Sequence, residues 1–189
     1  MKQAVIIHGF GGSPDNGFKG WLKNELEQAG WTVFNPQMPN PKQPLQQDWV
    51  NTIIQNIPNP DQQTYLVGHS LGCIAILRYL EQLPNNIKIG GVFLVAGFSQ
   101  MLKDAKYQPL ANFFNKPIAW PKIKQVCPNL ICFFSNNDWA VPAKQITPFK
   151  QQGAKIIILP DRGHFSDNDG CINLPELKQA ILNLSKKPA

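Results

Sequence analysis

The sequence GHSLG at residues 68–72 lies between two different apolar patterns. Residues 64–67 before it are β-branched, aromatic and aliphatic, which is typical of a strand. After it, residues 73–83 carry apolar side chains at helical spacing, and Pro84 ends that pattern. A serine at the centre of G-x-S-x-G between a strand and a helix predicts a nucleophile elbow, because the glycines permit a sharp turn that exposes the hydroxyl of Ser70. An ordinary glycine-rich turn is the alternative.

Strand and helix patterns alternate along the whole chain. The expected strands cover residues 4–7, 31–34, 64–67, 89–96, 130–134 and 155–159, and the expected helices cover 21–29, 45–57, 73–83, a segment opening near 142, and 174–184. This alternation predicts an α/β fold with a doubly wound, six-stranded, mostly parallel sheet and helices on both faces. The first strand should lie between the second and the third, so we expect the site at the carboxyl ends of the first and third strands.

Length and composition limit the possible partners. A chain of 189 residues fits a single domain over residues 1–189. The net charge is +6, but the lysines are scattered as on a solvated surface, so no nucleic-acid groove is expected. The four cysteines form no C-x-x-C pair and no apolar run approaches the length of a membrane span, which favours reduced thiols in a cytoplasmic protein without a membrane partner.

The least regular part of the chain is residues 97–128, where aromatic side chains are spread among polar residues and prolines. Two interpretations stay open for it. One is a helix packed on the edge of the sheet, and the other is a small cap over the site within residues 98–128.

The candidate catalytic residues follow three different strands. Of the three histidines, His69 is adjacent to the serine in a tight turn and should point elsewhere, which leaves His164, in the loop after the last strand, as the base. The base needs a carboxylate, and Asp138 follows the fifth strand, whereas Asp161 is the alternative. The order Ser70, Asp138, His164 is that of α/β-hydrolases.

A glycine-rich loop, HGFGG at residues 8–12, follows the first strand. It lacks the full dinucleotide-binding spacing and the Gly-Lys-Ser/Thr of a nucleotide loop. Its expected use is to bring a backbone N–H close to a substrate oxygen.

The motifs HGFGG, GHSLG, SNNDWAVP at residues 135–142, and GHF at 163–165 followed by LPEL at 174–177 resemble the small serine hydrolases related to retinoblastoma-binding protein 9 and the bacterial YdeN proteins. The resemblance covers almost the whole chain. It implies a reduced α/β-hydrolase fold, a triad at Ser70, Asp138 and His164, and an oxyanion hole formed by the N–H groups of Phe10 and Leu71. The retinoblastoma-binding sequence L-x-C-x-E is absent, so that partner is not expected.

These features predict a serine hydrolase that cleaves a small ester, thioester or amide through an acyl-enzyme intermediate and is carboxylesterase-like. Its expected partner is a small-molecule acyl substrate, with no cofactor or metal. Trp139 and Phe165 are candidates for the substrate pocket, with core packing as the alternative. An aminopeptidase-like amidase, or a protein-interaction module with little turnover, are the other functions considered.

Overall fold

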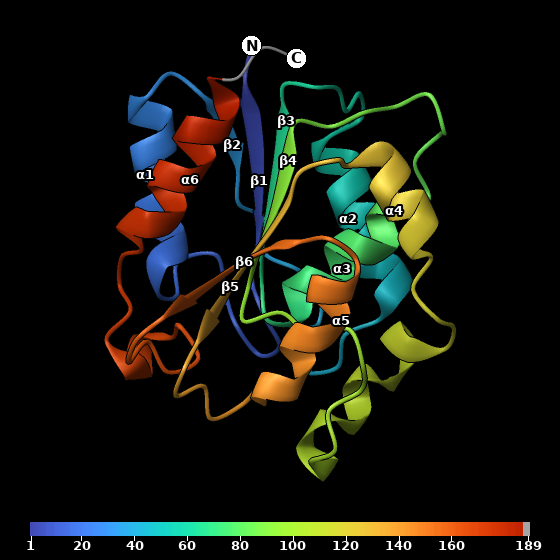
Figure 1. The fold of residues 1–189 in the computed structure, drawn as a ribbon, viewed down its shortest axis with the longest axis vertical. Helices are drawn as coiled ribbons and strands as arrows, with labels where there is room; N and C mark the ends of the chain where they lie inside the picture. Colours follow the sequence, from blue (N-terminus) through green and yellow to red (C-terminus); the bar gives the residue numbers. More distant parts are fainter. Residues whose placement is uncertain (187–189) are drawn as a thin grey trace.

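A six-stranded sheet forms the centre of the computed structural model, which describes residues 1–186 (Figure 1). The strands are β1 (Gln3–Ile7), β2 (Thr32–Phe34), β3 (Thr64–His69), β4 (Gly91–Val95), β5 (Leu130–Ser135) and β6 (Lys155–Leu159). Neighbouring strands all pair in parallel, in the order β2-β1-β3-β4-β5-β6. The α/β fold that the sequence predicts is confirmed.

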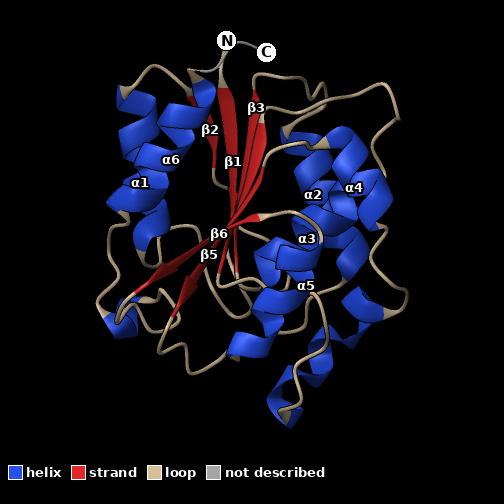
Figure 2. Ribbon diagram, in the orientation of Figure 1, coloured by secondary structure: helices blue, strands red, loops and turns tan. Residues whose placement is uncertain are grey.

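Helices cover both faces of the sheet, as Figure 2 shows. They are α1 (Phe18–Gln28), α2 (Gln46–Asn56), α3 (Leu71–Leu80), α4 (Trp120–Val126), α5 (Ile146–Gln151) and α6 (Pro175–Ser185). Helices α1 and α6 lie on one side, and α2, α3, α4 and α5 lie on the other. Each face therefore has its own apolar core.

Strand β1 is a continuous apolar run because both of its faces are buried. Successive side chains of a strand point to opposite faces. Ala4 and Ile6 accordingly pack into the core beneath α1 and α6, while Val5 and Ile7 pack into the core beneath α2 and α3. Burying an aliphatic side chain of this size contributes about 1.5–3 kcal/mol, so both faces stabilise the strand.

The strand order fixes where a site can form. Strand β1 pairs with β2 on one side and with β3 on the other, so the chain reverses its direction of winding between β1 and β3. In open parallel sheets the crevice at such a reversal, outside the carboxyl ends of the strands, is where ligands bind. The position of β1 between β2 and β3 is the one that the sequence predicts.

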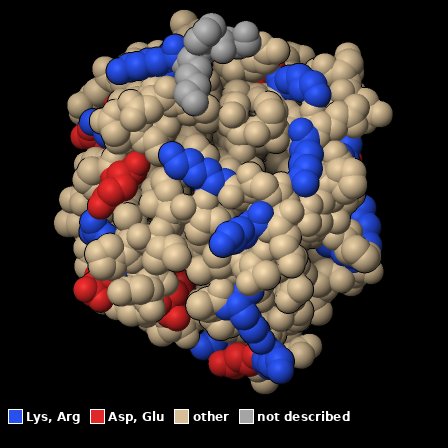
Figure 3. All heavy atoms as spheres, viewed as in Figure 1, with Lys and Arg blue, Asp and Glu red and all other residues tan. Residues whose placement is uncertain are grey.

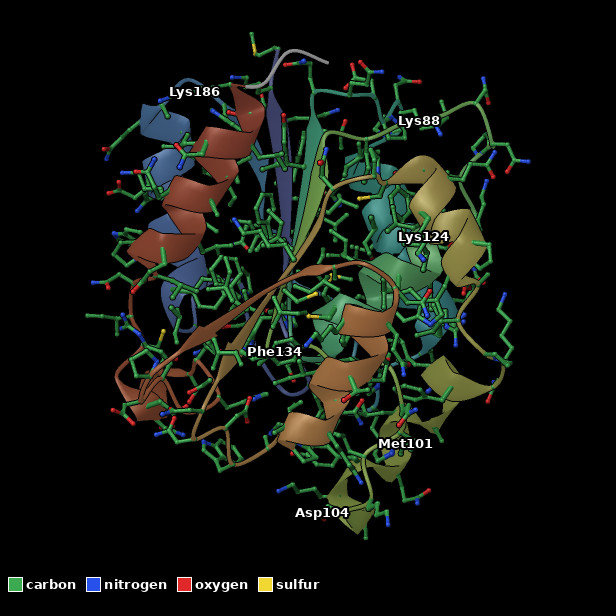
Figure 4. All side chains as sticks on the ribbon, in the orientation of Figure 1. Lys88, Met101, Asp104, Lys124, Phe134 and Lys186 are labelled. Carbon is green, nitrogen blue, oxygen red and sulfur yellow. The ribbon has the colours of Figure 1, made fainter. Side chains whose placement is uncertain are left out.

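Residues 97–128 contain a 3-10 helix, η1 (Ala105–Phe114), followed by α4. Helix α4 packs on α3, with Ile123 and Val126 in the core between α3 and the sheet. The segment before and including η1 extends below α5 in the view of Figure 4, where Met101 and Asp104 are labelled. Its action as a cap stays a prediction.

A buried arginine ties the end of η1 to α3. The guanidinium of Arg78 is 1% exposed, donates to the carbonyls of Phe113, Lys116 and Pro117, and pairs with Glu81 at 2.9 Å. Since α3 begins directly after Ser70, this contact links η1 to the helix that follows the elbow.

The basic side chains of the surface and the four cysteines can be compared with what the sequence predicts. On the face drawn in Figure 3, the Lys and Arg side chains are spread out and form no continuous stripe. All four cysteines are free and buried. Within residues 1–186 no helix is both long enough and apolar enough to cross a membrane.

Candidate active site

The elbow is shaped by close backbone contacts. Ser70 has φ 53° and ψ −116°, an unusual conformation for a residue with a side chain. A Cβ on Gly72 would lie 2.3 Å from the carbonyl oxygen of Ile7, and a Cβ on Gly68 would lie 2.8 Å from the backbone nitrogen of Cys73. A Cβ on Gly9 would lie 2.9 Å from the Cβ of Ser70. No side chain fits at these three positions, so only glycine is accommodated there.

Ser70, His164 and Asp138 form a continuous chain of hydrogen bonds. The Oγ of Ser70 lies 3.0 Å from Nε2 of His164, and Nδ1 of His164 lies 3.0 Å from both carboxylate oxygens of Asp138. A carboxylate only accepts, so Nδ1 carries the proton and Nε2 is free to accept the serine proton. Asp138 Oδ1 also accepts the N–H groups of Ala140 and Val141 at 2.8 and 2.9 Å, which holds the carboxylate in place.

The alternative acid, Asp161, lies elsewhere. It is exposed, and its own backbone N–H donates to Oδ1 of Asn136 at 2.8 Å. Oδ1 of Asn137, the residue after Asn136, accepts the backbone N–H of Gly163, also at 2.8 Å. The two asparagines that precede Asp138 thus hold the loop of His164, and the structure brings Asp138, not Asp161, to the imidazole.

Asp169, which sequence reasoning missed, organises the same loop. One of its carboxylate oxygens accepts the backbone N–H of His164 at 2.9 Å and the hydroxyl of Ser166 at 2.6 Å, and the other accepts Nε1–H of Trp139 at 3.1 Å. Partial burial raises the pKa of Asp169, but the hydrogen bonds from Ser166, Trp139 and His164 outweigh it and leave this pKa below its ordinary value. The ionised carboxylate therefore joins Trp139 to the histidine loop.

The other two histidines hold backbone in place. His69 Nε2–H donates to the carbonyl oxygen of His164 at 2.8 Å, and burial lowers the pKa of His69 well below its ordinary value. His8 Nδ1–H donates to the carbonyl of Gly9 at 2.8 Å, its Nε2 accepts the N–H of Met38 at 3.0 Å, and burial lowers its pKa as well. Both imidazoles are neutral and structural, so the sequence argument against His69 as the base agrees with its position.

Two backbone N–H groups near Ser70 are unused. In the glycine loop, the N–H of Gly11 donates to Pro41 at 2.8 Å and that of Gly12 donates to Gly9 at 3.1 Å. The N–H groups of Phe10 and Leu71, in contrast, have no acceptor within residues 1–186. Leu71 also opens α3, where the helix dipole favours negative charge. Both N–H groups are therefore free to donate to a ligand oxygen.

A cavity of about 350 Å³ opens onto the serine. Its wall includes the glycine loop, Ser70, His164, Trp139 and Lys19. Trp139 is 61% exposed, its ring lies 5.5 Å from that of His164, and it also borders a second cavity of about 430 Å³ beside η1. Trp139 is thus placed to contact a substrate in either cavity.

Phe165 is a correction to the sequence analysis. Its side chain is fully buried in the core beneath α1 and α6, so its expected place in the substrate pocket is wrong and the core-packing alternative holds. Phe165 lies in the turn after His164 with φ 55°, and its ring packs among the apolar side chains of that core.

Comparison with known proteins identifies the family. A family model described as serine hydrolase matches residues 4–183. The chain belongs to the serine hydrolase family. It is 36% identical over 187 residues to YdeN of Bacillus subtilis (strain 168), named as a hydrolase, which covers 98% of this chain and 97% of YdeN. It is 31% identical over 171 residues to the serine hydrolase RBBP9 of Rattus norvegicus, with 88% and 89% covered.

Solved structures agree on the fold. The crystal structure of the ydeN gene product from B. subtilis matches with a TM-score of 0.93 at 34% identity, covering 99% of this chain and 100% of that one. Est1E from Butyrivibrio proteoclasticus matches with a TM-score of 0.75 at 16% identity, covering 98% and 89%, which shows a shared fold alone. The predicted resemblance to the YdeN-related serine hydrolases is confirmed.

Proposed function

We propose that this serine hydrolase cleaves small esters, thioesters or amides through an acyl-enzyme intermediate on Ser70. The observation that carries the proposal is the hydrogen-bonded chain from Ser70 through His164 to Asp138, with 3.0 Å at each step, beside a cavity large enough for a substrate. This is the arrangement that activates a serine hydroxyl at neutral pH.

In the acylation half-reaction, Ser70 Oγ attacks the substrate carbonyl carbon while its proton moves to Nε2 of His164. Asp138 stabilises the imidazolium that forms, because its carboxylate already bonds Nδ1–H. The tetrahedral oxyanion accepts hydrogen bonds from the N–H groups of Phe10 and Leu71. When the tetrahedral species collapses, the carbonyl re-forms, and the leaving alcohol, thiol or amine takes the proton from His164.

Deacylation repeats these steps with water. His164 Nε2 accepts a proton from a water molecule, whose oxygen attacks the acyl carbonyl, and the proton then returns to Ser70 as the carboxylic acid leaves. One oxyanion donor of this kind contributes a factor of about 10²–10³ to the rate. The unused N–H groups of Phe10 and Leu71 support a two-donor hole.

The cavity supports a carboxylesterase-like preference for small acyl substrates. Its volume of about 350 Å³ lies near the lower end of the roughly 300–1,000 Å³ that small-molecule pockets span. The exposed ring of Trp139 supplies an apolar surface beside the base. The four buried free thiols fit a reducing compartment, so a cytoplasmic location is part of the proposal.

The test is labelling with a fluorophosphonate probe together with hydrolysis of a panel of aryl esters, thioesters and aminoacyl amides. We expect the probe to label Ser70 and the Ser70→Ala variant to lose labelling and at least about 10³-fold in kcat/KM, without a change in melting temperature. Ser13→Ala, at the far end of the glycine loop, is the matched control and should keep both. A Ser70→Ala variant with a substantial share of wild-type turnover would refute the assignment.

A further inference from the structure

Lys19 is a cation buried in the wall of the catalytic cavity. It is the second residue of α1, its exposed fraction is 2%, and it lines the same cavity as Ser70 and His164. The scattered lysines of this chain were expected on a solvated surface, and Lys19 is an exception. A lysine ammonium is strongly hydrated in water, so its burial needs a compensating partner.

That partner is missing from the protein itself. No carboxylate within residues 1–186 lies within 4 Å of the Lys19 ammonium, and no hydrogen bond from it is formed there. The Lys19 ammonium lies over the Phe18 ring in a cation–π contact, with Nζ 5.3 Å from the ring centroid. Arg78, which is buried as deeply, instead donates to three carbonyls and to Glu81. The chain thus satisfies one buried cation and leaves the other open toward the cavity.

The surroundings keep Lys19 charged at neutral pH. Burial lowers its pKa from 10.5 to about 8, while the charges of Asp167 and Cys171 act in the opposite direction. Asp167 is exposed and its carboxylate accepts the backbone N–H of Gly17. The remaining titratable groups that face Lys19 are His8 and His69, both buried imidazoles whose pKa values are lowered.

We infer that Lys19 binds a carboxylate of the substrate and makes this hydrolase selective for esters that carry a second, anionic group. The inference rests on the proposed function and adds a substrate class to it. A carboxylate suits the site because it accepts a charge-assisted hydrogen bond from an ammonium and replaces the water that burial removes. A neutral substrate would cover the ammonium in the cavity without giving it a partner, so the discrimination arises from a cation that loses its contact with solvent when the substrate binds.

The carboxylate could belong to the acyl part or to the leaving group, and two substrate pairs separate these sources. Monoethyl adipate against ethyl hexanoate places the charge on the acyl chain. 3-Acetoxybenzoate against phenyl acetate places it on the leaving group. For each pair the measured quantity is the ratio of kcat/KM for the anionic ester to kcat/KM for the neutral ester.

The variants are Lys19→Met, which keeps an unbranched chain of similar length, and Lys19→Gln, which keeps a polar end. Lys23→Met is the matched control, because Lys23 lies four residues after Lys19 on the same helix and pairs with Glu27 at 3.4 Å on the surface. It removes the same charge outside the catalytic cavity. Thermal unfolding establishes that each variant is folded.

In at least one pair we expect the wild-type ratio to exceed that of both Lys19 variants at least tenfold, with the Lys23→Met ratio within about threefold of the wild type. The wild-type ratio should also fall between pH 7 and pH 9, as Lys19 loses its charge at about 8, whereas the ratio of Lys19→Met should stay constant. The pair that responds identifies the half of the substrate that carries the charge.

Three results would overturn the inference, and they differ from one another. Equal ratios for the wild type and both Lys19 variants in both pairs refute carboxylate recognition while leaving ester hydrolysis intact. An equal decrease in Lys23→Met shows a general field effect of positive charge. A wild-type enzyme that turns over neither the neutral nor the anionic esters refutes the proposed function, and the inference fails with it.

Discussion

The elbow and the loop that carries His164 meet at one hydrogen bond, yet they are held in different ways. At residues 68–72 the position of Ser70 is fixed by backbone packing, with room for no Cβ at Gly68 or Gly72. In the loop of residues 161–170, the backbone N–H groups donate to side chains from other positions, among them Asn137 and Asp169. The elbow is held by steric packing, and the histidine loop is held by a network of hydrogen bonds.

This difference predicts different responses to mutation. A side chain added at Gly68 or Gly72 has no room, because the facing atoms belong to the backbones of β1 and α3. These backbones cannot move unless the sheet moves with them. A polar network can lose one member while the others keep the loop close to its position. Substitutions in the elbow should therefore affect folding, and those in the histidine loop should affect rate.

The largest effect is expected for Gly72→Ala. The new Cβ would lie 2.3 Å from the carbonyl oxygen of Ile7, which forces the elbow away from β1. We expect a loss of about 4 kcal/mol or more in the free energy of unfolding, measured by urea denaturation. Gly20→Ala is the control, because its Cβ would make only ordinary contacts at 3.7 Å and alanine favours the helix. A Gly72→Ala protein within about 1 kcal/mol of the wild type would show that the packing can relax.

The next effect separates the two candidate acids. Asp138→Asn should lower kcat/KM by about 10³–10⁴, since the amide cannot hold the imidazole in the same tautomer or stabilise its cation. Asp161→Asn, in which the same charge is removed from an exposed position in the loop of His164, should change it less than about threefold. Ester hydrolysis at pH 7.5 measures both. Equal losses would contradict the geometry found for Asp138.

The sequence alone predicted the parts of the site that are encoded locally. Ser70 follows from the glycines on either side of it, which the elbow requires, and each strand was placed within about two residues because buried strands are continuous apolar runs. Helix α1 begins earlier than expected, at Phe18, since Gly20 interrupts the helical pattern near its start. His164 and Asp138 follow from their positions after strands.

Other features depend on tertiary contacts that spacing does not encode. Asp169 is five residues after His164 in a polar loop, and nothing in the sequence indicates that its carboxylate turns back to the histidine backbone. Lys19 is one lysine among many, and its burial follows only from how α1 docks against the cavity. Phe165 was misplaced because its position next to His164 does not show that its ring is buried in the core.

A smaller effect tests the polar network directly. Asp169→Asn keeps one acceptor but loses the charge that four donors share: the hydroxyl and backbone N–H of Ser166, Nε1–H of Trp139 and the backbone N–H of His164. We expect kcat/KM to fall about ten- to hundredfold, with the free energy of unfolding reduced by only about 1–2 kcal/mol.

Trp139 fluorescence should shift in the same Asp169→Asn variant, because the Nε1–H bond to Asp169 is weakened. Asp161→Asn again serves as the control. A fall in activity without any change in Trp139 fluorescence would show that Asp169 does not act through this network.

The smallest effect concerns Lys19, the cation in the wall of the catalytic cavity. The pKa of Lys19 is about 8 in the folded chain against 10.5 in the unfolded chain, so below pH 8 folding buries a charge at a cost in free energy. Lys19→Met removes that cost, and since the loss of the attraction to Asp167 and to the Phe18 ring offsets part of the gain, we expect a net stabilisation of about 1 kcal/mol at pH 7. That corresponds to roughly 2–4 °C in melting temperature for a domain of this size.

The pH dependence of this difference has a definite sign. Between pH 8 and pH 10.5 the folded wild type has released the Lys19 proton while the unfolded chain still holds it, so the wild type gains stability relative to Lys19→Met as the pH rises. Urea denaturation of both proteins at pH 7, 8.5 and 10 measures it. A Lys19→Met advantage that shrinks across this series supports a buried ammonium maintained at a cost in stability, as expected for a residue kept for binding. A constant difference, or a variant less stable at pH 7, would mean that Lys19 serves the packing of α1 instead.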